Sequence, residues 1–142
     1  METTNLMEFI YSDGGRSNYF KGVTRDCVCR AIAIASDRDY LEVYQSMKKA
    51  IGSPRNGVQT HKKAFKDWMT ANGFVWVACS GIGCKTSVHF IKGELPQGRL
   101  VCSVAKHYVA VVDDKVFDIW DSRYNSFNEL RRIYGYWVYQ GK

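Results

Sequence analysis

The sequence predicts a single α+β domain in which N-terminal helices precede a small antiparallel β-sheet. Apolar residues recur at helical spacing from Cys27 to about residue 72, and beyond residue 73 short runs of β-branched and aromatic residues take over. The chain has 142 residues, of which 46% are hydrophobic, and this is enough apolar material for one core. We therefore expect residues 1–142 to form one domain without a linker.

The first predicted helix begins at Cys27, after a polar loop with three glycines over residues 11–25. Its buried stripe at i, i+3, i+4 and i+7 comprises Val28, Ala31, Ile32 and Ala35. Asp26 suits the N-cap position. The positive end of a helix dipole stabilises a thiolate, so Cys27 is expected to be the reactive thiol. Cys29 lies about 200° further around the helix and is expected to pack in the core.

Two further helices are predicted before the strands. Asp39-x-x-Glu42 is a capping-box pattern for the second helix. Its expected apolar side comprises Leu41, Tyr44, Met47 and Ile51. The third helix is expected over residues 60–72, with a core side of Ala64, Phe65, Trp68 and Met69.

The rest of the chain is predicted to be mostly strand. The expected strands cover residues 74–78, 99–104, 107–112, 116–120 and 136–139. Between the first two, residues 86–95 are expected to form a short helix or a turn. Ser126-x-x-Glu129 predicts one last capped helix, which continues through Ile133.

The third and fourth strands form a predicted hairpin that begins with His107. If the Asp113-Asp114 pair alone makes the loop, His107 and Asp118 share a face, with their backbones roughly 7–8 Å apart. A three-residue loop would instead place Asp121 opposite His107. The turn chemistry favours the two-residue loop, since a three-residue loop is usually built with glycine. Asp118 is therefore the preferred partner of His107, and Asp121 is the reserve candidate.

Cys27, His107 and Asp118 together form a candidate catalytic triad. A lone strand histidine is most simply structural, but an upstream thiol at a helix start provides a nucleophile for it to serve. A thiol that attacks, an imidazole that moves the proton and a carboxylate that orients the imidazole are the groups needed for acyl transfer. The residues thus predict a thiol enzyme that acts on an amide, ester or isopeptide bond.

This arrangement resembles the papain-like cysteine peptidase superfamily, which has the same chain order of cysteine, histidine and acidic residue. Four segments are also similar to small peptidase-like proteins of bacteriophages and other mobile elements. They are Asp-Cys-x-x-Arg-Ala-Ile-Ala at 26–33, Lys-His-Tyr-Val-Ala-Val-Val at 106–112, Asp-Ile-Trp-Asp-Ser at 118–122 and Tyr-Gly-Tyr-Trp at 134–137. The resemblance implies a nucleophile helix packed on a small antiparallel sheet, a peptide or protein substrate, and a bacterial or phage setting.

The sequence departs from this superfamily at the oxyanion site. Papain-like enzymes usually carry a glutamine about six residues before the cysteine, which helps to bind the oxyanion. Position 21 here is lysine. Asn18 is the candidate replacement, and the backbone N–H of Cys27 is the second expected donor.

The composition indicates which kinds of binding partner and which cellular compartment to expect. A formal charge of +6 would favour an anionic partner if it were clustered, but the basic residues are scattered along the sequence. Nucleic-acid binding is therefore the lesser hypothesis. Five cysteines without scaffold spacing are expected to be reduced thiols, and no stretch resembles a leader or a membrane span. We expect a cytoplasmic protein without a cofactor.

Two alternatives stay open. Cys79, Cys84 and His89 have a spacing that suggests a metal, but zinc needs a second ligand pair that is missing, so no metal is expected. The alternative function is a non-catalytic binding module of the same fold. Such a module would bind a host protein or nucleic acid through its basic, aromatic surface.

Overall fold

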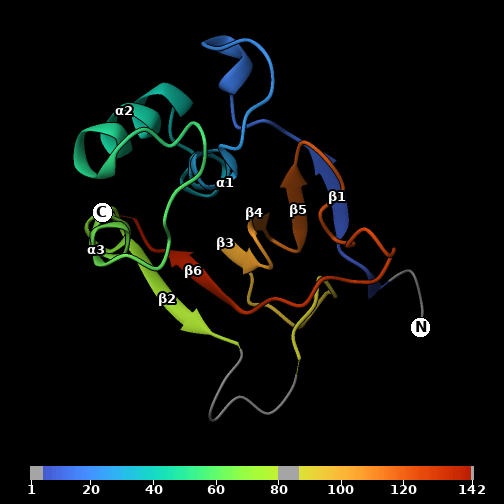
Figure 1. Cartoon of the computed structure of the whole chain (residues 1–142). Coiled ribbons are helices and arrows are strands. Elements are labelled where there is room, and N and C mark those ends of the chain that lie inside the picture. Colours follow the sequence, from blue (N-terminus) through green and yellow to red (C-terminus); the bar gives the residue numbers. More distant parts are fainter. Residues whose placement is uncertain (1–4, 80–86, 142) are drawn as a thin grey trace.

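The computed structural model describes residues 5–79 and 87–141, which form a mixed sheet and a group of helices (Figure 1). The helices are α1 (Cys27–Ser36), α2 (Tyr40–Ile51) and α3 (Lys63–Ala71), preceded by a 3-10 turn, η2 (Arg16–Asn18). The strands are β1 (Glu8–Tyr11), β2 (Phe74–Ala78), β3 (Arg99–Val104), β4 (His107–Val112), β5 (Lys115–Asp118) and β6 (Gly135–Tyr139). The predicted α+β class is confirmed. Among the described helices, none has the length and apolar character required to cross a bilayer.

The six strands lie in the order β1-β5-β4-β3-β6-β2. The neighbours from β5 to β2 are antiparallel, whereas β1 pairs with β5 in parallel, from Glu8 opposite Lys115 to Tyr11 opposite Asp118. The expectation of a purely antiparallel sheet is therefore wrong at this edge. A four-residue run carries little strand signal, and its partner lies more than a hundred positions along the chain.

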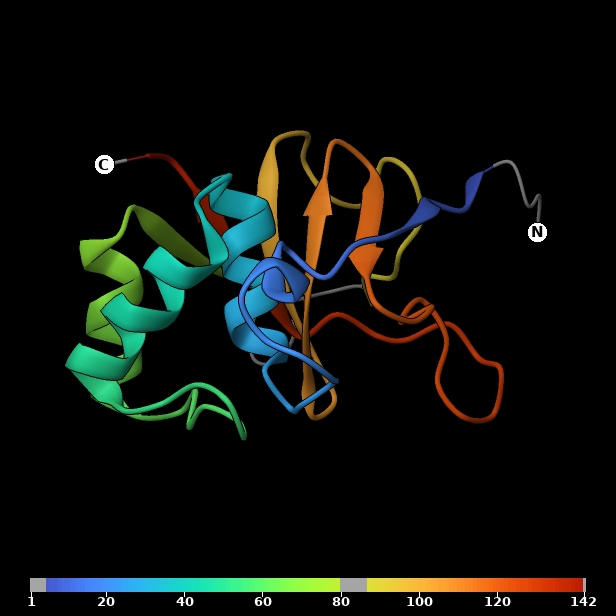
Figure 2. The ribbon, with the colours of Figure 1, turned by 90° about the horizontal axis from the view of Figure 1, so that it is seen from above.

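The helices cover one face of the sheet, and α1 packs directly across β4 and β3 (Figure 2). The side chains of β3 and β4 alternate, so Val101 and Ala110 join the helices in one core. Leu100 and Val111 point to the opposite face and join a second core beneath the loops that follow β2 and β5. The α1 helix is thus fixed on the sheet by apolar packing, and its first turn lies near the start of β4.

The other two helices match the predicted spans with small shifts. Asp39 caps α2 by accepting the Glu42 N–H at 3.3 Å, as predicted. The buried side of α2 is Tyr40, Val43 and Met47, so the predicted face is rotated by about one residue. Helix α3 buries Phe65, Trp68 and Met69 as expected, but Ala64 is exposed.

The predicted helix from Ser126 to Ile133 is wrong. Asn125, not Ser126, accepts the backbone N–H groups of Phe127 and Glu129, at 2.9 and 3.0 Å. Asn128 has a φ of 60°, which is left-handed and incompatible with a continuing helix. The segment closes as a loop instead. Residues 87–95 form a turn and isolated bridges, which is the second of the two expected alternatives.

Candidate active site

The hairpin of β4 and β5 has the two-residue loop that the sequence favours. Val112 pairs with Lys115 and Val111 with Val116, so only the Asp113-Asp114 pair lies between the strands. Both aspartates have positive φ, 49° and 64°, which is the backbone of a tight primed turn. This register sets which acidic side chain shares a face with His107.

Asp118 is that side chain. Its Oδ2 lies 2.5 Å from His107 Nε2, and both side chains are nearly excluded from solvent. Asp121 lies beyond the end of β5, where its carboxylate binds the Arg123 guanidinium at 2.7 and 2.8 Å. The preference for Asp118 over Asp121 as the neighbour of the imidazole therefore agrees with the geometry.

Cys27 completes the group from the other layer. Because α1 crosses β4, the thiol at the first position of α1 meets the start of that strand. The sulfur is hydrogen-bonded to the His107 side chain and accepts the backbone N–H of Tyr108. With Nε2 held by Asp118, Nδ1 is the ring nitrogen left to serve the thiol. Thiol, imidazole and carboxylate thus form one continuous chain of contacts.

The two central groups have opposite shifts in pKa. Burial raises the pKa of Cys27, but the hydrogen bond and charge of His107, the Tyr108 N–H and the charge of Arg30 outweigh it, so the net pKa is lowered. Burial lowers the pKa of His107, but Asp118 and Cys27 overcome it and raise the pKa to about 9. These directions favour a thiolate beside an imidazolium at neutral pH.

A cleft of about 650 Å³ opens over this pair. Its walls come from the loop before α1, the loop between α2 and α3, the β3–β4 turn and the segments after β5 and before β6. Trp120 lies in the wall, and its ring stacks on the His107 ring with centroids 4.8 Å apart. The cleft has the size of an ordinary ligand site.

A buried charge network supports the triad from behind. Arg30 binds the Asp26 carboxylate through Nη1, and its Nη2 lies 3.7 Å from Asp118 Oδ1. Asp26 also accepts from Tyr40 and lies 3.4 Å from Arg16. Asp26 therefore occupies the N-cap position of α1 without capping it, and the predicted capping role is wrong. Its fully buried carboxylate instead pairs with two arginines.

Sequence reasoning missed Arg30, although Asp26-x-x-x-Arg30 is the i, i+4 spacing of a helical ion pair. It also placed Asn18 at the oxyanion. Asn18 is exposed on η2 and does not line the cleft, so the structure corrects that assignment. Thr24 does line the cleft, and its buried Oγ1 has no hydrogen-bond partner within residues 5–79 and 87–141.

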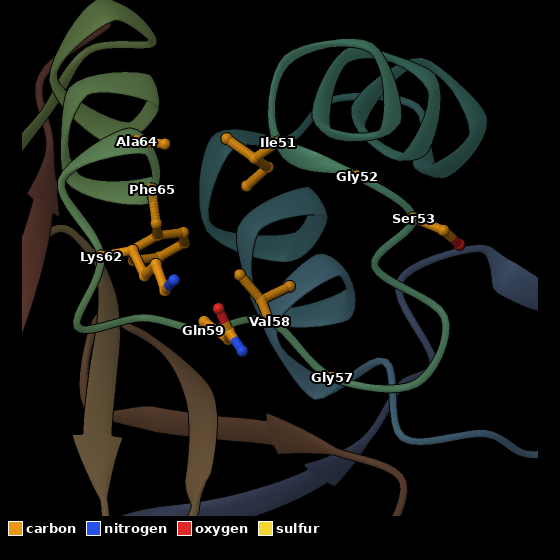
Figure 3. A pocket seen from close by; sticks show the side chains of 9 residues that line it. All are labelled: Ile51, Gly52, Ser53, Gly57, Val58, Gln59, Lys62, Ala64 and Phe65. Carbon is orange, nitrogen blue, oxygen red and sulfur yellow. The ribbon is translucent and has the colours of Figure 1, made fainter.

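A smaller cavity of about 280 Å³ adjoins the cleft, since Gly57 and Val58 line both. In Figure 3 the side chains of Ile51, Val58 and Phe65 point toward this common space between α2 and α3. Of the residues that the structure describes, no histidine, cysteine or carboxylate lines this cavity. It is therefore an extension of the cleft with a mixed polar and apolar lining, and it offers no second nucleophile or base.

The metal alternative receives no support from the described part of the chain. Within it, no three His, Cys, Asp or Glu side chains are grouped as metal ligands. Cys84 lies outside the described residues, as do residues 80–86 as a whole. His89 instead faces Glu94, with Nδ1 and Oε1 3.9 Å apart.

No protein-family model, curated protein or solved structure matches this chain.

Proposed function

We propose that the protein is a papain-like thiol hydrolase or acyltransferase that acts on an amide, ester or isopeptide bond. One observation carries this proposal: Cys27, His107 and Asp118 come from three separate elements and meet in one chain of contacts at the floor of a cleft. A nucleophile, a base and an orienting group in mutual contact are what covalent acyl transfer requires.

In the first half-reaction, the Cys27 thiolate attacks the acyl carbon and a tetrahedral oxyanion forms. The His107 imidazolium then gives its proton to the departing amine or alcohol, and a thioester remains on the sulfur. In the second half-reaction, neutral His107 takes a proton from water or from an acceptor amine, which attacks the thioester and releases Cys27. Asp118 holds the imidazole orientation and stabilises its positive charge throughout.

The oxyanion has two candidate donors. The backbone N–H of Cys27 belongs to the first turn of α1, where amides have no acceptor within the helix. The Thr24 hydroxyl is the second candidate, because Thr24 lines the cleft and its buried Oγ1 lacks a partner within the described ranges. We propose this pair in place of Asn18.

The biological setting is part of the proposal. The four phage-like segments and the unscaffolded cysteines support work in the cytoplasm of a bacterial or phage-infected cell, on a peptide or protein substrate. No cofactor enters this chemistry.

Acylation by p-nitrophenyl acetate tests the function without knowledge of the substrate. We expect a burst of nitrophenol and an acetyl thioester on Cys27, mapped by mass spectrometry of the intact protein and its peptides. Cys27→Ala should abolish the burst, and the matched variant Cys29→Ala should keep it. Absence of Cys27 acylation, or equal acylation of Cys29, would favour the non-catalytic binding module.

A further inference from the structure

Three cations near Cys27 and His107 have no carboxylate partner among the described residues. Arg25 lies two residues before Cys27, and Lys106 directly precedes His107; both are exposed and line the cleft. Arg131 is not itself a lining residue, but its guanidinium lies 5.3 Å from the centre of the ring of Trp120, which lines the cleft. Its hydrogen bonds go to the neutral carbonyls of Tyr124 and Ala105. Among the ion pairs of the described residues, none includes any of these three cations.

The interior charges of the site cancel one another. Arg16 and Arg30 are matched by Asp26 and Asp118, and the thiolate is matched by the imidazolium. No Asp or Glu of the described residues lines the cleft. The cleft therefore carries a surplus of positive charge, set on both sides of the nucleophile.

The surplus lies next to an aromatic surface. Trp120 and Tyr134 line the cleft with 41% and 43% of their surface exposed. Such rings hold a ligand by apolar contact and leave the cations to select its charge.

We propose that the substrate is an acidic peptide segment, with carboxylate side chains flanking the bond that Cys27 attacks and an apolar side chain nearby. This rests on the proposed function and names its substrate class. Carboxylates would pair with Arg25, Lys106 and Arg131, and an aromatic or aliphatic side chain would contact Trp120.

Nucleic acid fits these observations less well. Polynucleotide sites track many phosphates along an extended basic groove. Here two of the three cations line one cleft of about 650 Å³ and the third lies against its Trp120 wall. The proposed reactive pair attacks acyl carbons, which nucleic acids do not present.

The first experiment compares alkylation of Cys27 by iodoacetate and by iodoacetamide at low salt, each normalised to free cysteine. Each cation should favour the anionic reagent by about threefold, and about 0.5 M salt should remove most of this preference. Lys106→Gln and Arg25→Gln should each lower the ratio by about threefold. Lys48→Gln, on the exposed side of α2, is the matched control and should leave it unchanged. A ratio near one at low salt would overturn the proposal.

The second experiment measures binding to the Cys27→Ala protein by fluorescence anisotropy, with a neutral dye on each probe. The probes are a Glu-Glu-Phe-Glu-Glu peptide, its Lys-Lys-Phe-Lys-Lys counterpart and a short oligothymidylate. The acidic peptide should bind at least about tenfold tighter than the basic one and should lose affinity in Lys106→Gln. Tighter binding of the oligothymidylate, or equal binding of both peptides, would overturn the proposal.

The two experiments separate this inference from the proposed function. Fluorescence anisotropy does not depend on a reactive thiol. If the acidic peptide binds but Cys27 is not acylated, the proposed acyl transfer is wrong and the preference for an acidic peptide stands. If Cys27 is acylated but shows no charge preference, the proposed acyl transfer stands and the proposed acidic substrate is wrong.

Discussion

Cys27 and Cys29 lie two residues apart on the same helix turn, yet their surroundings shift the pKa values of the two thiols in opposite directions. Cys27 faces β4, where His107 and the Tyr108 N–H lower its pKa despite burial. Cys29 faces the interior between α1 and α2, where burial raises its pKa to about 12 and the nearby Asp26 carboxylate adds to the effect. The helix dipole acts on both thiols. The difference therefore teaches that the facing side chains, and not the helix start alone, decide which thiol is reactive.

The charge of Arg30 acts on both Cys27 and Cys29. Its replacement should have the largest effect, which is a loss of stability. Arg30→Met leaves Asp26 without one of its two arginine partners and removes the cation beside Asp118, both of which are buried. Breaking a buried ion pair typically costs about 3 kcal/mol or more of unfolding free energy. Urea denaturation would measure the loss. Lys63→Met is the matched i, i+4 control, and it should scarcely change stability, because the Lys63–Asp67 pair is exposed.

Removal of His107 should lower the reactivity of Cys27 and leave that of Cys29 unchanged. In His107→Ala, burial still raises the Cys27 pKa, while the hydrogen bond and the charge that offset it are gone. Alkylation of Cys27 at about pH 6.5 should fall by at least about tenfold, since each pKa unit changes the thiolate fraction tenfold. Peptide mapping after iodoacetamide treatment would measure this, and Cys29 should stay unlabelled in both proteins as the sign that each is folded. His107→Gln, which stays polar without a cation, should lose nearly as much; full reactivity in either variant would count against the pair.

Asp118 and Asp121 can be compared in the same way by their effect on the pKa of His107, which in turn contacts the Cys27 sulfur. Asp118→Asn should lower the His107 pKa from about 9 by at least one unit, because the main charge that raises it is removed. Asp121→Asn should leave that pKa unchanged, since its carboxylate serves Arg123. NMR titration of the His107 ring would measure both, and a larger shift in Asp121→Asn would reverse the assignment.

The same pKa would set an upper pH limit for the proposed acyl transfer. Departure of the leaving group needs the imidazolium, which loses its proton as pH rises through about 9, so wild-type turnover should decline above that pH. In Asp118→Asn the decline should begin at a lower pH. A stopped-flow pH series with p-nitroacetanilide, whose amine leaving group needs that proton, would show the limit, and a rate that keeps rising beyond pH 9 in both proteins would contradict the assigned acid.

Trp120 should have the smallest effect. Its ring stacks on His107 and favours the imidazolium by about 0.5–1 kcal/mol, so Trp120→Ala should lower the His107 pKa by roughly half a unit. The same NMR titration would detect the shift. Phe127→Ala is the control, because Phe127 is 82% exposed and does not line the cleft.

Local chemistry explains what the sequence could predict of this site. The Asp113-Asp114 turn set the hairpin register, and the register placed Asp118 and not Asp121 beside His107. The thiol at the head of an apolar helix was similarly readable, because helix starts and buried stripes follow short-range rules. These features involve residues that are close in sequence.

Contacts between segments far apart in the chain could not be predicted from the sequence. The parallel pairing of β1 with β5 depends on residues more than a hundred positions apart. The approach of Arg30 to Asp118 depends on how α1 crosses the sheet, which no local pattern encodes. Ser126-x-x-Glu129 failed for a different reason, since the neighbouring Asn125 side chain accepted the same amides and closed a turn.

The most direct test of the central claim is the pH dependence of iodoacetamide labelling at Cys27 and Cys29 in one sample of wild-type protein. A thiolate held by His107 predicts that Cys27 labelling stays fast well below the free-cysteine pKa of about 8.5. Cys29 should stay unlabelled until the protein unfolds or the pH approaches about 12. If both thiols titrate together near pH 8.5, the imidazole does not stabilise the Cys27 thiolate, and the account of the site is contradicted.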